Sequence, residues 1–128
     1  MKKILTCIVL SLSLNLGFSA HSFAGFYDME DVEQHFNEYK KAKSADEALT
    51  ALFHMKNATI DCWVNLPPKL NQLNQYDPKV LAYRATIDRL LEQVYLARQL
   101  VLDGKFNEAQ KLAKKMEEIK KEGHKKFK

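Results

Sequence analysis

The sequence has few of the residues that interrupt helices: four glycines and three prolines among 128 residues. Two of the prolines are adjacent, Pro67 and Pro68, and the third is Pro78. Long stretches therefore carry no residue that is strongly unfavourable inside a helix. No strand-length stretch alternates apolar and polar residues in the way that a half-buried β-strand requires. These absences favour an all-α fold.

Cysteine is also scarce. Cys7 lies in an apolar N-terminal segment, and Cys62 is the only cysteine after that segment. A single thiol cannot form an internal disulfide, so we expect Cys62 to be a buried small apolar residue. The CxxCH motif is absent, which excludes covalent c-type haem attachment by the usual route.

Neither sign of charge is in large excess. Once Lys2 and Lys3 are set aside, 18 basic residues remain against 16 acidic ones. This near-neutral balance argues against a broad nucleic-acid-binding surface. Lysines do crowd the C-terminal segment, where we expect a solvated helix face that suits the negative end of the helix dipole. These lysines are Lys111, Lys114, Lys115, Lys120, Lys121, Lys125, Lys126 and Lys128.

The one long apolar run occurs at residues 4–18, after Lys2 and Lys3. Small residues at Ser22 and Ala24 follow it in the positions that signal peptidase requires. We therefore predict that residues 1–24 are a secretory signal peptide and that residues 25–128 form the mature domain. An uncleaved anchor is the alternative, but the run is short of the roughly 20 residues that span a bilayer. No later segment is apolar enough to cross a membrane.

Four later segments repeat apolar residues at steps of three and four, which is the spacing of an amphipathic helix. They cover about residues 28–41, 44–66, 77–102 and 106–127. Four such helices with short connections predict an all-α, antiparallel, up-down-up-down four-helix bundle.

Capping residues support these boundaries. Ser44 and Glu47 have the spacing of a capping box. Asp77 and Pro78 are suited to the N-cap and first position of the third helix. Gly104 is suited to the left-handed conformation that ends this helix.

Two side chains from opposite ends of the chain are candidate metal ligands. The start of the first helix and the end of the fourth lie at the same end of such a bundle, so Met29 and His124 would face each other. A thioether and an imidazole form one axial ligand pair of haem iron. The other histidines of the mature chain, His35 and His54, are expected on the surface. We expect mostly apolar side chains to line the site: Val32, Phe36, Pro67, Pro68, Tyr83 and Ile87.

The same segments resemble the cytochrome b562 family. The resemblance is carried by Asp28-Met29-Glu30, by Pro67-Pro68-Lys69-Leu70, and by His124 with the basic and aromatic residues after it. It runs without a gap from about residue 28 to residue 128. It implies a soluble monomeric electron carrier of the Gram-negative periplasm, not an enzyme, which exchanges electrons with unidentified redox proteins. It also implies one non-covalent haem b per chain, with Met29 and His124 as the axial ligands.

The sequence departs from the family's pattern at several positions. Ile87 stands where the family has an aromatic residue, and Phe36 where it has leucine, a pair of changes that roughly conserves volume. Lys120 and Lys128 replace arginines near the haem edge and the terminus, so a propionate would meet a point charge rather than a bidentate donor.

The principal alternative is a periplasmic helical bundle without haem that binds partners or acts as a chaperone. Exposed Phe53, Trp63 or Tyr95 would then carry the function. An enzyme is disfavoured, because the mature chain shows no Ser/His/Asp, Cys/His or paired-carboxylate arrangement beyond chance. An absorption spectrum would separate the two main hypotheses.

Overall fold

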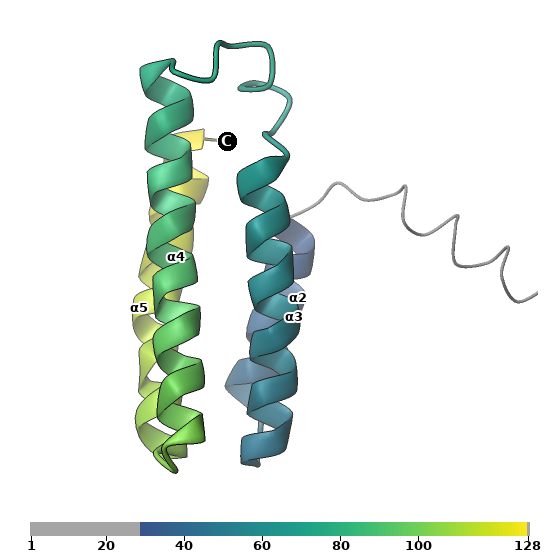
Figure 1. Ribbon diagram of the computed structural model, residues 1–128, viewed down its shortest axis with the longest axis vertical. Coiled ribbons are helices and arrows are strands. Elements are labelled where there is room, and N and C mark those ends of the chain that lie inside the picture. The colour runs from purple at the N-terminus through teal and green to yellow at the C-terminus, as the bar shows by residue number, and fades with distance from the viewer. Residues whose placement is uncertain (1–28, 128) are drawn as a thin grey trace, which may run out of the picture.

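The computed structural model describes residues 29–127, and the predicted signal peptide lies outside them. Four helices follow one another along the chain: α2 (Met29–Lys41), α3 (Ala45–Val64), α4 (Pro78–Leu102) and α5 (Phe106–Phe127). They run up and down side by side, and each helix packs on its neighbour in sequence (Figure 1). Within residues 29–127 there is no strand. The predicted all-α four-helix bundle is confirmed.

The start of α3 follows the predicted capping pattern with one difference. The Ser44 hydroxyl accepts a hydrogen bond from the Glu47 N–H at 3.2 Å. The Glu47 carboxylate, however, accepts from the N–H of Lys43 at 2.7 Å rather than from that of Ser44. The first contact satisfies a backbone donor that the first helical turn leaves without a partner, and the second satisfies the N–H of the residue before the N-cap.

The boundaries of α4 are those that the sequence predicts. Asp77 accepts a hydrogen bond from the N–H of Lys79 at 2.8 Å, and Pro78 is the first helical residue. Gly104, just beyond the C-terminal end, has a φ angle of +79°, which is unfavourable for residues with a Cβ atom.

Helix α3 ends earlier than predicted, at Val64 rather than near residue 66. Asn65 caps it with extended backbone geometry, and its N–H donates to the Asp61 carbonyl at 2.8 Å. The residue before a proline is disfavoured in helical geometry, and here the helix stops before that restriction applies at Leu66. The loop that follows buries Leu70, which anchors it on the bundle.

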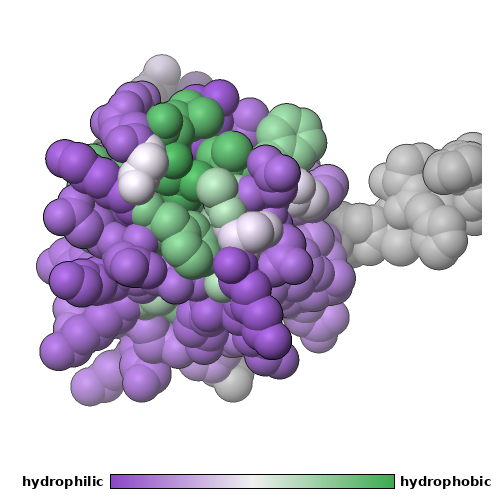
Figure 2. All heavy atoms as spheres, turned by 90° about the horizontal axis from the view of Figure 1, so that it is seen from below, coloured by the Kyte–Doolittle hydropathy of each residue, from purple (hydrophilic) through white to green (hydrophobic). Residues whose placement is uncertain are grey.

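The core is one continuous cluster that receives side chains from all four helices. Its largest fully buried members are Tyr39, Phe36, Leu52, Met55, Leu90, Met116 and Ile119. The core extends toward the end that carries the α2–α3 and α4–α5 connections. Seen from this end, apolar side chains lie at the centre and polar ones surround them (Figure 2).

Helices α2 and α5 meet much less extensively than the other neighbouring pairs. Two side chains bridge them near this end of the bundle. The buried Tyr39 hydroxyl donates to the Ala109 carbonyl, and the Gln110 amide donates to the Ala42 carbonyl at 2.8 Å. Burial raises the pKa of Tyr39 far above its usual range, so the phenol stays protonated and remains a donor.

None of the four described helices has the length and apolar character needed to span a bilayer.

Candidate cofactor site

The opposite end of the bundle contains a cavity of about 240 Å³. It lies among the first residue of α2, the loop after α3, the first half of α4 and the last turns of α5. Most of its lining is apolar: Met29, Pro67, Tyr83, Thr86, Ile87, Leu90, Ile119, Lys120, Gly123, His124 and Phe127.

A second, more polar cavity of about 420 Å³ lies beside the first. The two have Met29, Lys120 and His124 in common. The remaining lining of the second cavity is charged: Glu30, Glu33, Glu117, Lys121 and Lys125. The site therefore combines an apolar interior with a polar edge, the combination that binds an amphipathic ligand.

The fold brings the two candidate ligands, Met29 and His124, to the same pair of cavities. Met29 is 39% exposed at the first position of α2, and His124 is exposed in the last turn of α5. No group of three or more His, Cys, Asp or Glu residues within 29–127 could hold a metal ion. One thioether and one imidazole are too few for a bare ion, but they suffice for iron whose other four ligands belong to a macrocycle. The donor set therefore fits haem.

Cys62, in the last turns of α3, contacts the sulfur atom of Met29. Its Sγ atom lies 3.8 Å from the Met29 Sδ atom, and the residue is only 3% exposed. The Tyr83 hydroxyl donates to the Cys62 carbonyl at 3.1 Å, which ties α4 to the same place. The sequence predicted that Cys62 is buried, but not that it contacts the candidate ligand.

Lys120 is a buried cation at the boundary of the two cavities. It is 7% exposed and forms ion pairs with Glu33 of α2 and, at 3.4 Å, with Glu117 of α5. Its ammonium also lies 3.9 Å from the centroid of the Phe36 ring, a cation–π contact. A buried charge is costly unless it is paired, and these contacts meet that requirement.

The predicted lining residues divide into two groups. Pro67, Tyr83, Ile87 and Lys120 border the first cavity, as expected. Val32 and Phe36 are fully buried in the core and are not among its lining residues. Pro68 is exposed and does not line it either.

Five lining residues were not predicted: Thr86, Leu90, Ile119, Gly123 and Phe127. Their spacing contained a usable signal. Thr86 and Leu90 follow Tyr83 at steps of three and four, and Gly123 and Phe127 follow Ile119 at steps of four. Each set therefore lies on one face of its helix.

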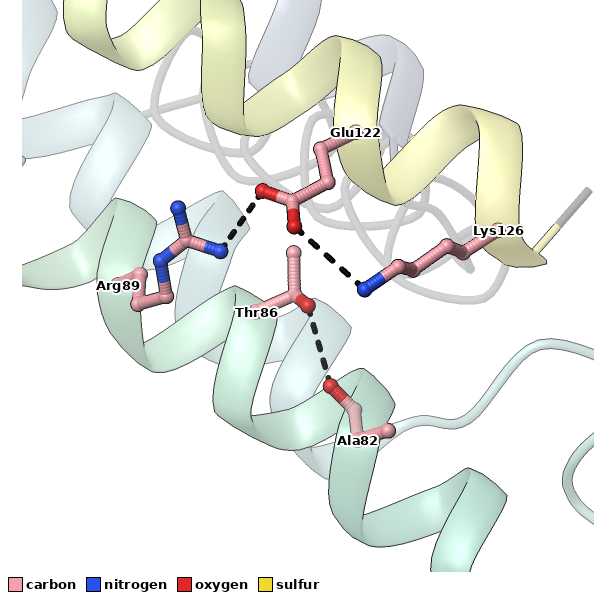
Figure 3. A network of polar contacts seen from close by, with 5 residues as sticks. All are labelled: Ala82, Thr86, Arg89, Glu122 and Lys126. Atoms are coloured by element: carbon pink, nitrogen blue, oxygen red, sulfur yellow. Dashed lines mark hydrogen bonds and ion pairs between the residues drawn. The ribbon is translucent and has the colours of Figure 1, made fainter.

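Helices α4 and α5 approach closely at Gly123. A Cβ atom on this residue would lie 3.1 Å from the Thr86 Cγ2 atom. The Thr86 hydroxyl donates to the Ala82 carbonyl at 3.1 Å, which fixes the orientation of its methyl group (Figure 3). Glycine thus lets the last turns of α5 lie against α4, which brings His124 to the cavity.

Polar contacts hold the same turns in place. Glu122 of α5 accepts a hydrogen bond from Arg89 of α4 at 2.7 Å and pairs with Lys126 at 3.5 Å (Figure 3). The Arg89 hydrogen bond and charge lower the pKa of Glu122. A lowered pKa favours the folded state above the carboxyl's unfolded pKa, and this contribution is lost as the pH falls through the folded pKa. On the inner side, Phe127 contacts Tyr83 edge-on, with ring centroids 5.3 Å apart.

The close approach predicts a coupling between Gly123 and Thr86. In the Thr86→Ser background the obstructing methyl group is absent, so Gly123→Ala should raise the free energy of unfolding by up to about 1 kcal/mol through helix propensity. In the wild-type background the crowded contact should cancel most of this gain. Urea denaturation of the haem-free wild type, both single variants and the double variant measures the coupling. Equal effects of Gly123→Ala in both backgrounds would contradict the contact.

Two comparisons place the chain among known proteins. Residues 27–128 match the model of the cytochrome b562 family. A protein of Yersinia pestis named "Probable soluble cytochrome b562 2" is 28% identical over 100 residues, which cover 78% of each chain. The family match includes all four helices and every residue that borders the two cavities. The chain belongs to the cytochrome b562 family.

Proposed function

We propose that this protein is a haem-binding electron carrier with one non-covalent haem b per chain, held between Met29 and His124. The observation that carries the proposal is the meeting of a thioether and an imidazole at one apolar cavity, from opposite ends of the described chain. Membership of the cytochrome b562 family supports it. The predicted resemblance is confirmed at the level of the family.

The chain would supply two iron ligands and the apolar lining of the haem cavity. Tyr83, Ile87, Leu90 and Phe127 offer apolar surface that excludes water from a flat macrocycle. Bound haem supplies a one-electron ferric/ferrous couple. With both Met29 and His124 bound, haem iron would have no position open to a substrate, which suits a carrier rather than an enzyme, and the thioether would raise the reduction potential.

Lys120 is the candidate partner for a haem propionate, because its ammonium borders both cavities. It would exchange part of its pairing with Glu33 or Glu117 for the ligand's carboxylate. Lys128, the other predicted candidate, lies outside the described residues. Removal of residues 1–24 on export would deliver the domain to the periplasm as a monomer.

An absorption spectrum of the purified mature protein, oxidised and reduced, tests the proposal. A Soret band that saturates at one equivalent of added haem, with the α and β bands of a low-spin ferrous haem, is the expected result. A mature protein that binds no haem would overturn it and favour the haem-free interaction bundle.

Met29→Ala tests the sixth ligand. The variant should fold and retain haem through His124, and its ferric spectrum should become high-spin as water takes the position of the thioether. His35→Ala and His54→Ala are matched controls, because these two rings stack on each other between α2 and α3, with centroids 5.0 Å apart, and border neither cavity. An unchanged low-spin spectrum in Met29→Ala would exclude Met29 as a ligand.

A further inference from the structure

The two halves of the bundle carry opposite charge. Helices α2 and α3 contain seven acidic residues against three lysines, whereas α4 and α5 contain eleven lysines and arginines against six acidic residues. The near-neutral net charge of the mature chain does not reveal this separation, because the two halves nearly cancel. The bundle therefore has an electric dipole directed across its helices, from the α2–α3 half toward the α4–α5 half.

The positive charge on α5 is concentrated in a stripe. At 100° per residue, six of its lysines fall within a sector about 140° wide, on the side away from the core residues Ala109 and Met116. All six are exposed: Lys111, Lys114, Lys115, Lys121, Lys125 and Lys126. Within residues 29–127, Lys126 alone among them forms an ion pair, with Glu122.

The helix dipole does not account for this stripe. Its favourable effect on cations is confined to the last turn, which here includes Lys125 and Lys126. Lys111, Lys114 and Lys115 lie two or more turns earlier. The dipole therefore leaves the position of these three lysines unexplained.

The stripe reaches the candidate cofactor site. Lys121 and Lys125 line the second cavity together with His124, and Glu30 and Glu33 of α2 lie on its other side. An anionic surface that approaches this end of the molecule is attracted by α5 and repelled by α2. The charge pattern thus favours one orientation, with α5 toward the partner.

We propose that the outer face of α5, at the end that borders the cavities, docks an electron-transfer protein with an acidic surface around its own cofactor. The inference rests on the proposed function and adds the class of partner. Complementary charge accelerates encounter between proteins by factors of about 10 to 1,000 at low ionic strength. Nucleic acid and anionic membranes fit less well, because Glu118 and Glu122 lie within the stripe and the other half of the bundle is acidic.

The test uses the haem-loaded protein and an acidic flavodoxin as the probe. Stopped-flow measurement gives the second-order rate constant for reduction of the ferric protein by flavodoxin hydroquinone. Lys121→Glu with Lys125→Glu should lower this constant about tenfold or more at low ionic strength, and high salt should abolish the difference. The neutral pair Lys121→Gln with Lys125→Gln should give a smaller loss in the same direction.

Lys114→Glu with Lys115→Glu is the matched control. It makes the same change in net charge on the same helix, centred roughly 13 Å along the helix axis from Lys121 and Lys125, which exceeds the screening length of about 10 Å at 0.1 M salt. At that ionic strength its rate constant should stay within about twofold of wild type. Equal losses in both glutamate variants at 0.1 M salt, or no loss in either at any ionic strength, would overturn the docking site.

Two further measurements distinguish protein docking from a loss of haem and from membrane binding. The haem content of each variant is measured, and rate constants are compared only for fully haem-loaded protein; a wild-type protein that binds no haem would refute the proposed function instead. Oxidised flavodoxin, added to the ferric protein, should shift NMR resonances of residues 118–126. Co-sedimentation of the wild type with phosphatidylglycerol vesicles, abolished in Lys121→Glu with Lys125→Glu, would assign the lysines to a membrane and contradict the protein partner.

Discussion

Replacing His124 by alanine is expected to lower haem affinity by more than about a hundredfold. Loss of an outer-shell partner alone typically costs a metal site about 10- to 100-fold in affinity, and loss of the ligand itself costs more. The effect should exceed that of Met29→Ala, because imidazole is the stronger ligand for iron. Titration of the haem-free variants with haem, followed by transfer of haem to apomyoglobin, measures both affinities.

Because His124 is exposed, the effect of its replacement on haem affinity can be separated from an effect on folding. An exposed side chain contributes little to the fold, so His124→Ala should change the stability of the haem-free protein by less than about 0.5 kcal/mol. His54→Ala, another exposed histidine, should leave both stability and affinity unchanged. Equal retention of haem by the His124 and Met29 variants would contradict the assignment of His124 as the dominant ligand.

Haem should raise the free energy of unfolding by roughly 4 kcal/mol at a free concentration a thousand times its Kd. That is a large share of the 5–15 kcal/mol typical of a domain. Hydrogen exchange should show the largest gain at one end of the bundle, because there the empty cavity removes packing and lets amides exchange by local opening. We expect new protection at residues 28–36, at residues 119–127 and around Pro67 and Pro68.

The middle of the bundle provides the internal control. Leu52 and Val94 are fully buried without the cofactor, so their amides should already be protected in the haem-free protein. A gain at the two ends of the described chain that is no larger than the gain at Leu52 and Val94, which reflects global unfolding alone, would contradict a site formed by both ends.

The sequence was sufficient for the helices because their boundaries depend on local chemistry. Asp77, Pro78 and Gly104 act within one or two residues of where they stand, and the ends of α4 follow them. The end of α3 was placed too late for a related reason. Pro67 marks the latest possible end of the helix, whereas the actual end at Val64 depends on how Asn65 caps it.

The site was only partly predictable, because its lining depends on how far each side chain lies along the helix axis. The structure places Met29 at the end of the bundle that contains the two cavities. Phe36 lies seven residues later, or about 10 Å along α2, and at that depth its ring packs in the core. The ion pair between Lys120 and Glu33 could not be predicted either. It depends on the register between α2 and α5, which no local sequence pattern encodes. The signal peptide and the axial ligands stay predictions.

The sparse contact between α2 and α5 bears on how a ligand enters. Polar side chains bridge this seam: Tyr39 and Gln110 bond to backbone carbonyls, and Lys120 and Lys40 pair with glutamates. Such contacts give way at lower free energy than the apolar interfaces of α3 with α4. Helices α2 and α5 can therefore separate from each other while α3 and α4 stay packed together. A flat macrocycle would enter between their ends, where Met29 and His124 border the cavity.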